Sequence, residues 1–313
     1  MKILVTGVAG FIGFHLSKKL LEEGHDIVGI DNITHYYDPK LKLLRLSLLS
    51  SNKFQFFELD INEIDSLNQD FDLVINLAAQ AGVRLSKINK NNYLHSNVNG
   101  FKQVVKFCID NSIDKVVYAS SSSVYDDSLT NAFSERSSNL NPKSFYGETK
   151  LFNEEYIESI NSSIDFIGLR FFSVYGPYGR PDMAYYLFAD SICKDKTIRL
   201  HNKGLMARDM TYIADAVDGI MRSIEYLKEN KGCSHQIFNI GNDNPVKTYR
   251  LLQLIESILD KKAKITNVDV LNESIYTHAD LTRSREILGY NPEINLQEGM
   301  QEFIKWYKKY ENF

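Results

Sequence analysis

Short apolar runs alternate with amphipathic stretches along the first half of the chain. The runs are rich in β-branched residues and predict buried strands at residues 1–6, 25–30, 54–59, 71–79, 114–119 and 164–170. The stretches between them carry apolar residues at helical spacing, notably at 11–21, 41–49, 91–111 and 146–160. This alternation predicts an α/β fold with a doubly wound parallel sheet of the Rossmann type.

Beyond residue 170 the alternation becomes less regular. An extended loop is expected at 171–183, followed by a helix at 183–193, a strand at 198–200 and helices near 214–228, 248–259, 282–288 and 296–310. These elements predict a smaller substrate domain, mainly residues 171–313, over the carboxyl ends of the strands. A strand at 236–240 is expected to return to the main sheet. The large domain is therefore predicted as residues 1–170 with return segments near 210–242, so that the two domains interleave.

A glycine-rich turn joins the first strand to the first helix. Gly7 permits a tight turn, Gly10 lets the backbone approach a pyrophosphate, and Gly13 lets the helix pack close to the sheet. The helix N-terminus presents unpaired N–H groups and a positive dipole end to phosphates. A three-glycine pattern alone is weak evidence, but the flanking strands and a following acid favour a dinucleotide-binding unit.

That acid is Asp31, at the end of the second strand. Its carboxylate can accept hydrogen bonds from both hydroxyls of an adenosine ribose and would repel a 2′-phosphate, so NAD is expected rather than NADP. No Arg or Lys follows at once, since the next residues are Asn32 and Ile33. At the end of the third strand Asp60 has two compatible interpretations: it accepts from the adenine amino group, or it caps the helix at 62–67.

The end of the fourth strand is the next expected contact with the cofactor. Ala78 and Ala79 are small enough to let a cofactor lie against the strand end. Arg84 follows closely, and two interpretations stay open: it meets phosphate or carboxylate in the ligand cleft, or it is a solvated surface residue. The residues expected to contact NAD are Gly7, Gly10, Phe11, Ile12, Gly13, Asp31, Asn32, Asp60, Ile61, Leu77, Ala78, Ala79, Tyr146 and Lys150.

The fifth predicted strand runs into four serines, Ser120 to Ser123, and a later helix carries Tyr146 and Lys150. Their spacing puts both side chains on one helical face, one turn apart. Lowering a tyrosine pKa from ~10 by about three units takes roughly 4 kcal/mol, which a nearby ammonium and an oxidised nicotinamide can supply. Taken alone, such a pair is usually an exposed helix turn. After a dinucleotide unit and a serine-ended strand, it indicates a catalytic pair.

Charge and composition narrow the class of protein. The net charge of −4 over 313 residues leaves no basic surface, so nucleic acid is not an expected partner. Cys108, Cys193 and Cys233 lack disulfide or zinc spacing and suit a reducing cytoplasm, and no metal site is expected. No apolar run is long enough to span a membrane, and the chain opens directly on a strand, so neither a membrane segment nor a signal peptide is expected.

With these motifs the chain resembles an extended short-chain dehydrogenase/reductase and, more narrowly, the UDP-glucuronate 4-epimerases. The likeness covers nearly the whole chain. It is carried by the glycine unit and by residues 76–84, 118–125, 169–184, 208–213 and 279–282, of which Ala-Gly-Val-Arg84 and Gly-Arg-Pro-Asp-Met183 are the specific ones. The resemblance implies an NAD-dependent 4-epimerisation of a UDP-sugar in the cytoplasm, with UDP-glucuronate converted to UDP-galacturonate through a 4-keto intermediate.

The resemblance also implies roles for the matching residues. Tyr146 would be the general base and acid, Lys150 its electrostatic partner and a ribose contact, and Ser121 the hydroxyl that hydrogen-bonds the sugar O4. Other positions match substrate contacts: Ser122, Ser173 and Arg180 for the sugar carboxylate, and Arg208 and Asp280 around the UDP. The helices at 91–111 and 146–160 match those that form a four-helix bundle in family homodimers.

Related 4,6-dehydratases and decarboxylases carry an acid just before the Val-Tyr pair, where this chain has Ser122 and Ser123, and this difference argues against both activities. Other features leave the identity of the sugar open. The chain departs from the family pattern at Asp126 (usually Gly), Ser173 (Thr), Met210 (an aromatic) and Ala214 (an acid). Two alternatives therefore remain: an epimerase or 4-keto reductase acting on another, neutral nucleotide sugar, and a non-catalytic protein that kept the fold.

Overall fold

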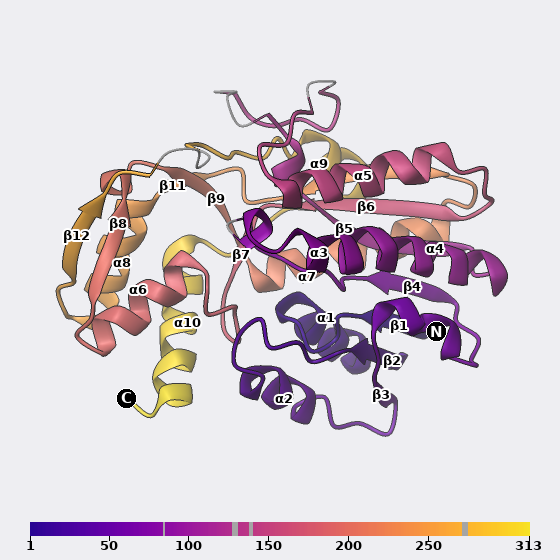
Figure 1. Ribbon diagram of the computed structural model, residues 1–313, viewed down its shortest axis with the longest axis horizontal. Helices are drawn as coiled ribbons and strands as arrows, with labels where there is room; N and C mark the ends of the chain where they lie inside the picture. Colours follow the sequence, from indigo (N-terminus) through magenta and orange to yellow (C-terminus); the bar gives the residue numbers. More distant parts are fainter. Residues whose placement is uncertain (84, 127–130, 138–139, 271–274) are drawn as a thin grey trace.

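A seven-stranded parallel sheet forms the centre of the protein in a computed structural model that describes residues 1–83, 85–126, 131–137, 140–270 and 275–313 (Figure 1). The strand order is β10-β6-β5-β4-β1-β2-β3, which confirms the doubly wound α/β fold. The strands are β1 (Lys2–Thr6), β2 (Asp26–Asp31), β3 (Phe54–Glu58), β4 (Leu73–Asn76), β5 (Lys115–Ser121), β6 (Asp165–Phe171) and β10 (His235–Ile240). Because the order reverses between β1 and β4, a crevice is expected at their carboxyl ends.

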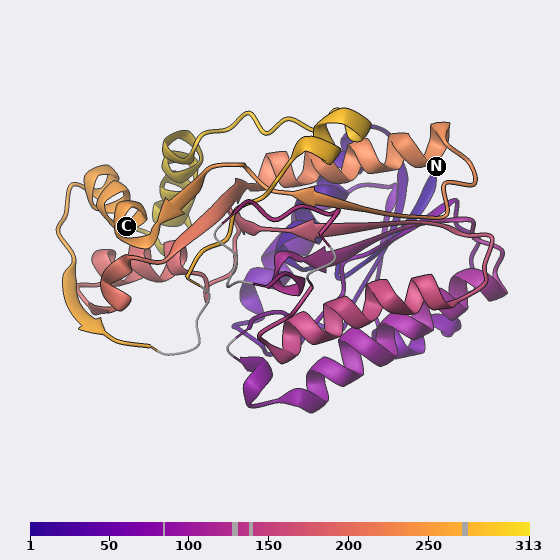
Figure 2. The ribbon, with the colours of Figure 1, turned by 90° about the horizontal axis from the view of Figure 1, so that it is seen from above.

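Alternate residues of each strand face the two sides of this sheet and form two apolar cores. Ile3 and Val5 of β1 face the helices α1 (Phe11–Glu22), α7 (Ile213–Glu229) and α9 (Thr282–Leu288). Leu4, between them, faces α4 (Gly100–Asp110) and α5 (Phe145–Ser159) on the opposite side. Figure 2 shows these two helical layers above and below the sheet. Burial on both faces explains why the strands read as continuous apolar runs.

The helix expected at 91–111 is confirmed, and it runs without a break through α3 (Lys90–Tyr93), a π-helical segment (Leu94–Asn99) and α4. Two other local expectations were wrong. The loop expected at 171–183 contains a short strand, β7 (Ser173–Tyr175), which pairs with β9 (Ala207–Tyr212). The fourth strand ends at Asn76 rather than Ala79, so the small residues that follow it are already outside the sheet.

A second group of elements lies beside the large sheet, on the left of Figure 1. It contains the three-stranded sheet β11-β9-β7 and the pair β12-β8, with β8 (Thr197–His201), β11 (Pro245–Lys247) and β12 (Lys264–Val268). Its helices are α6 (Ala184–Cys193), α8 (Thr248–Leu259) and α10 (Leu296–Glu311), packed around an aromatic core. Between these elements the chain returns through α7 and β10, which pairs with β6 in the large sheet. Residue 170 as the domain boundary stays a prediction.

Candidate active site

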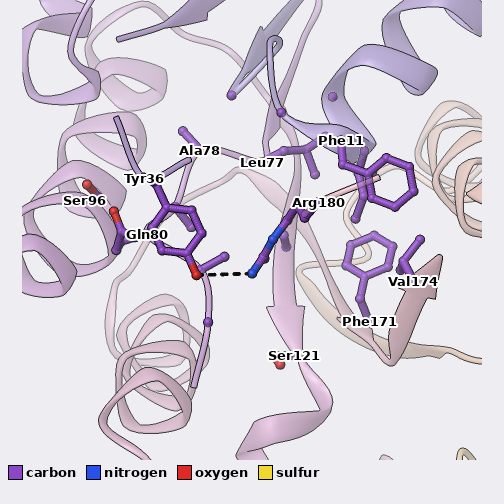
Figure 3. A pocket seen from close by; sticks show the side chains of 18 of the residues that line it. Phe11, Tyr36, Leu77, Ala78, Gln80, Ser96, Ser121, Phe171, Val174 and Arg180 are labelled. Atoms are coloured by element: carbon purple, nitrogen blue, oxygen red, sulfur yellow. Dashed lines mark hydrogen bonds between the residues drawn. The ribbon is translucent and has the colours of Figure 1, made fainter. Parts of the chain in front are cut away.

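A cavity of about 380 Å³ lies at the carboxyl ends of the central strands (Figure 3). It brings together most of the residues singled out in the sequence. Those that line it are Gly7, Gly10, Phe11, Ile12, Gly13, Asp31, Asn32, Ile61, Leu77, Ala78, Ala79, Ser121, Ser122, Tyr146, Lys150, Ser173 and Arg180. Asp60, Arg208 and Asp280 are not in its lining, and Arg84 lies outside the described residues.

The glycine turn forms one wall of this cavity at the N-terminus of α1. Gly7 has φ +70°, which an L side chain rarely adopts, and its carbonyl accepts a hydrogen bond from the Gly10 N–H at 2.9 Å. A Cβ placed on Gly13 would lie 2.3 Å from the Gly7 oxygen. The turn is therefore closed tightly enough that only glycine fits, and it borders the cavity at the N-terminus of α1, the end of a helix that favours phosphate. The residues present fit a dinucleotide.

Asp31 lies at the end of β2, and its Oδ1 accepts the Ile33 N–H at 2.9 Å. Lys42, on α2 (Lys40–Ser47), places its Nζ 3.5 Å from the same carboxylate, and both side chains are 8% exposed. Burial lowers the pKa of Lys42, and Asp31 opposes that effect. Lys42 was not predicted as a site residue, because the residues directly after Asp31 are Asn32 and Ile33 and the lysine comes only on the next helix. The basic, leucine-rich pattern of the helix was the available signal.

Asp60 is the N-cap of a 3-10 helix, Ile61–Ser66, and accepts the Asn62 N–H at 2.9 Å. The capping interpretation is therefore confirmed, while the contact with adenine stays a prediction. Burial raises the pKa of this carboxyl, but hydrogen bonds from Asn62, His95 and Asn32 outweigh burial and bring it to about 2. Its Oδ2 accepts from the Asn32 amide at 2.8 Å, which ties the ends of β2 and β3 together.

Tyr146 and Lys150 lie on α5, whose N-cap Ser144 accepts the Gly147 N–H at 3.0 Å. The Lys150 Nζ donates to the Ala119 carbonyl at 2.7 Å and lies 6.0 Å from the centroid of the Tyr146 ring. Burial raises the pKa of the phenol, whereas a hydrogen bond with Ser121 and the charge of Arg180 lower it. The structure thus assembles a phenol, a hydroxyl and two cations in one cavity.

Glu154 lies one turn beyond Lys150 and was not singled out in the sequence. Its Oε1 accepts from the Ser120 hydroxyl and from the Arg170 Nε at 2.9 Å, and its Oε2 accepts from the Arg170 Nη2 at 2.6 Å. Burial lowers the pKa of Lys150 to about 8, and the Glu154 carboxylate acts in the opposite direction. The signal available in the sequence was the continued spacing of four residues, Tyr146, Lys150 and Glu154.

Arg180 reaches across the cavity toward Tyr36, which follows β2 (Figure 3). Its Nε and Nη2 donate to the Asp182 carboxylate at 3.1 and 2.6 Å. The Tyr36 hydroxyl donates to the same carboxylate at 2.8 Å. Neither Tyr36 nor Asp182 was predicted as a site residue, since the contact joins segments far apart in the chain.

Of the remaining predicted substrate contacts, Ser122 lines the cavity, whereas Arg208 and Asp280 do not. Ser122 opens a 3-10 turn after β5, and the Ser121 Oγ caps that turn by accepting the Ser123 N–H at 3.1 Å. Arg208 lies on β9 and donates to the Ala207 carbonyl at 2.9 Å. Asp280 accepts the Thr282 N–H at 2.9 Å, just before α9. Their contacts with substrate stay predictions.

Comparison with known proteins agrees with this geometry. The NAD dependent epimerase/dehydratase family matches residues 3–241. A relative from Methanocaldococcus jannaschii, itself uncharacterized, is 44% identical over 97% of this chain and 95% of its own length. UDP-glucuronate 4-epimerase 4 of Arabidopsis thaliana is 38% identical over 98% of this chain and 75% of its own. The crystal structure of UDP-glucuronic acid 4-epimerase from Bacillus cereus with UDP-glucuronic acid and NAD superimposes with a TM-score of 0.93 at 33% identity, covering 99% of this chain and all of that one.

No helix within the described residues is both long and apolar enough to cross a membrane.

Proposed function

The chain belongs to the NAD dependent epimerase/dehydratase family, and from this premise we propose that it epimerises UDP-glucuronate at C4 to UDP-galacturonate. One observation carries the proposal: the cavity that holds Tyr146, Lys150 and Ser121 is also lined by the Arg180 guanidinium. The first three groups serve 4-epimerisation of any UDP-sugar. An arginine close enough to affect the pKa of the catalytic phenol gives the reacting sugar a partner for an acid group.

The residues that would hold NAD are those of the glycine turn at the pyrophosphate, Asp31 at the adenosine ribose, and Lys150 at the second ribose. Leu77, Ala78 and Ala79 line the same cavity, and the small alanine side chains leave room for the dinucleotide. When bound, NAD accepts a hydride from C4 of the sugar and later returns it, so it is neither consumed nor regenerated by another substrate. We expect the protein to retain it as a prosthetic group.

Tyr146 serves as the base and then as the acid. As a phenolate stabilised by Lys150, it accepts the O4 proton while the C4–H bond breaks, which gives a 4-keto sugar. Ser121 hydrogen-bonds O4 and holds it against the phenol. After the sugar turns over, hydride returns to the opposite face of C4 and Tyr146 gives back the proton to O4. Atoms and charge balance, and only the configuration at C4 changes.

The acid group of glucuronate makes the intermediate a β-keto acid, which tends to lose carbon dioxide. In the proposed site, Arg180, Ser122 and Ser173 bind the carboxylate and stabilise its charged form. They also hold the C5–C6 bond out of line with the carbonyl π system, so that the electron pair cannot pass into the ketone. Arg208 and Asp280 are proposed to contact the UDP, and Arg84 to contact a phosphate or the sugar carboxylate.

The direct test is incubation of the purified protein with UDP-glucuronate and detection of UDP-galacturonate by NMR. Tyr146→Phe should abolish conversion while cofactor stays bound. The matched control is Tyr156→Phe, which removes a hydroxyl from the same helix, where the ring stacks on Phe152 instead of lining the cavity. This control should convert UDP-glucuronate at the wild-type rate.

An unchanged UDP-glucuronate pool with UDP-glucose converted instead would contradict the choice of sugar. Net consumption of added NADH would identify a 4-keto reductase. Arg180→Ala should lose conversion of the uronic acid while sparing a neutral UDP-sugar, or leak a pentose. Equal loss with both sugars would contradict the assigned role of Arg180.

We further propose that the protein is a cytoplasmic homodimer. The helices α4 and α5 lie together on one face of the sheet (Figure 2), and Lys102 of α4 lies over the Phe152 ring of α5 at 5.1 Å. Two exposed apolar side chains, Leu94 of the π-helical segment and Ile109 of α4, support a helical interface there. Light scattering should give twice the mass of the chain, and a monomer at micromolar concentration would contradict this. The three cysteines are unpaired, in keeping with a reducing compartment.

A further inference from the structure

Three segments meet around the Arg180 guanidinium. Tyr36 comes from the loop after β2, Gly82 from the segment after β4, and Asp182 from the segment that carries Arg180 itself. The Tyr36 hydroxyl donates to the Asp182 carboxylate at 2.8 Å and lies 3.5 Å from the Arg180 Nη2. The loop after β2 is thereby joined directly to the segment that carries Arg180.

Asp182 occupies one particular edge of the guanidinium. It accepts from Nε at 3.1 Å and from Nη2 at 2.6 Å, a two-point contact that fixes the plane of the group. No hydrogen bond from the described residues occupies Nη1. Nη2 also donates to the Tyr36 hydroxyl at 3.5 Å, so the two N–H groups of Nη1 are left for another carboxylate. A lone arginine side chain has many rotamers, and this contact selects one of them.

The position of Tyr36 is itself restricted by Gly82. A Cβ on Gly82 would lie 2.4 Å from the Tyr36 hydroxyl oxygen, and the glycine has φ +99°. The hydroxyl can reach Asp182 only because that Cβ is absent. The Ala81 and Gly82 carbonyls both lie within hydrogen-bond distance of the Tyr93 hydroxyl, and the Tyr93 ring meets the Tyr146 ring edge-on with centroids 6.2 Å apart. A continuous series of contacts thus relates Arg180 to the catalytic phenol.

The depth of the two side chains indicates that Asp182 does not compete with the sugar carboxylate for Arg180. Its side chain is 36% exposed, whereas that of Arg180 is 22% exposed, so the carboxylate lies at the rim and the guanidinium deeper. A sugar carboxylate bound to Nη1 would not need to displace Asp182 from Nε and Nη2. Arginine has enough donors to bind two carboxylates at two edges.

We propose that Asp182 and Tyr36 are positioning residues that make this enzyme selective for acidic UDP-sugars, by holding Arg180 with its Nη1 group available to the sugar carboxylate. The inference rests on the proposed function, because it requires a uronic acid in the cavity. It goes beyond Arg180 in assigning selectivity to two side chains that need not touch the sugar.

The test uses the NAD-loaded enzyme and two substrates that differ at the acid group, UDP-glucuronate and UDP-glucose. Asp182→Asn and Tyr36→Phe are compared with Asp38→Asn, which removes an exposed carboxylate from the same loop as Tyr36. Affinity for each nucleotide sugar is measured by calorimetry, and turnover and product identity by NMR. Asp182→Asn should lower kcat/KM for UDP-glucuronate by about tenfold or more, and Tyr36→Phe by about threefold or more, while affinity for UDP-glucose stays within about twofold of wild type.

A second readout follows the fate of the keto acid. If the carboxylate is held less firmly, the C5–C6 bond breaks, carbon dioxide leaves, and the electron pair and a proton at C5 give a UDP-4-keto-pentose. The hydride then remains on the cofactor, so pentose formation is accompanied by an equal amount of bound NADH. Both variants should raise the ratio of this pentose to UDP-galacturonate, and Asp38→Asn should not. A merely structural defect would reduce both products together.

Three results with the variants would overturn the inference: equal loss with both substrates in both variants, tighter binding of UDP-glucuronate by Asp182→Asn, or unchanged selectivity. The second would show that Asp182 competes with the sugar carboxylate. Tyr36→Phe keeps the ring and covers the case in which Asp182→Asn fails to fold. Wild-type turnover tests the proposed function separately. If wild type shows no preference in affinity for the acid over the neutral sugar, the inference also fails, since no oriented carboxylate site would then exist.

Discussion

At the level of single residues, the charge of Lys150 sets an upper pH limit on the proposed chemistry. Burial lowers the pKa of its ammonium to about 8, and Glu154 opposes that effect. In the proposed mechanism the base is the Tyr146 phenolate, which the ammonium stabilises, so kcat should fall as pH rises above about 8 and Lys150 loses its proton. Glu154→Gln removes the opposing charge, and the alkaline limb of the kcat profile should therefore move to lower pH.

The control for that experiment is Glu158→Gln, one turn further along α5, where the carboxylate is 70% exposed. It should leave the limb where it is in wild type. A profile that does not move in Glu154→Gln, or that moves to higher pH, would show that Glu154 acts only through its ion pair with Arg170.

Asp31 and Lys42 give a prediction about cofactor choice. In the proposed cofactor site the Asp31 carboxylate would repel a 2′-phosphate, but the Lys42 ammonium 3.5 Å away would attract one. Asp31→Asn should therefore shift the ratio of NADP to NAD affinity by about tenfold or more toward NADP, measured by calorimetry on cofactor-free protein. Adding Lys42→Met should reverse most of the gain. If the double variant keeps the full NADP affinity, Lys42 is not the group that meets the phosphate.

At the level of elements, α1 and α2 both hold the segment that leads to Arg180. Arg45 of α2 is fully buried and donates to the Ala9 carbonyl at 2.9 Å and to the Tyr178 carbonyl at 2.6 and 3.0 Å. His15 of α1 lies with its Nε2 2.9 Å from the Pro177 carbonyl oxygen. The glycine turn and the segment that carries Arg180 are therefore attached to the same two helices.

His15 makes this attachment sensitive to acid. Burial lowers its pKa from 6.5 to about 4, while the hydrogen bond to Pro177 acts in the opposite direction. The unfolded chain thus binds a proton in a range where the folded chain does not, and stability should be lost as pH falls from about 6.5 to about 4. The loss assigned to this residue is on the order of 2–3 kcal/mol. Urea unfolding at several pH values should show a shallower decline for His15→Gln than for wild type.

The exposed His35, in the loop after β2, provides the matched control, and His35→Gln should follow the wild-type curve. His235, whose pKa burial also lowers to about 4, accounts for part of the decline that remains in His15→Gln. A slope unchanged in His15→Gln would mean that the imidazole stays accessible to protons in the folded state.

At the level of the whole molecule, local patterns were predictable from the sequence and long-range contacts were not. The glycine turn and the Tyr146–Lys150 spacing are encoded within a few residues, and both were found in the cavity. β12 was missed because its residues are mostly exposed and show no alternation. The contact of Tyr36 with Asp182 joins residues 146 positions apart, which no periodicity reports. Lys42 was missed for a similar reason, since the fold of α2 brings it to Asp31.

Those long-range contacts determine how the molecule unfolds. The aromatic core around α6, α8 and α10 is separate from the two cores of the large sheet, which would favour independent unfolding of the smaller part. Against this, Tyr290 lies in a core of the large sheet and donates to the Gly241 carbonyl at 2.8 Å, and Asp215 of α7 accepts from the N–H groups of Glu293 and Ile294. The chain crosses between the two parts several times, so neither can unfold without removing buried partners from the other.

We therefore expect one cooperative transition, and Trp306 allows the test because it is the single tryptophan in the sequence. It lies on α10 and packs against Tyr178, at 5.0 Å between ring centroids, while the Tyr178 carbonyl is held by Arg45 of α2. Its fluorescence thus reports the junction of the two parts, whereas far-ultraviolet circular dichroism reports the whole chain. Denaturant curves from the two probes should coincide. A fluorescence midpoint clearly below that of circular dichroism would show that the smaller part detaches first, and with it the segment that positions Arg180.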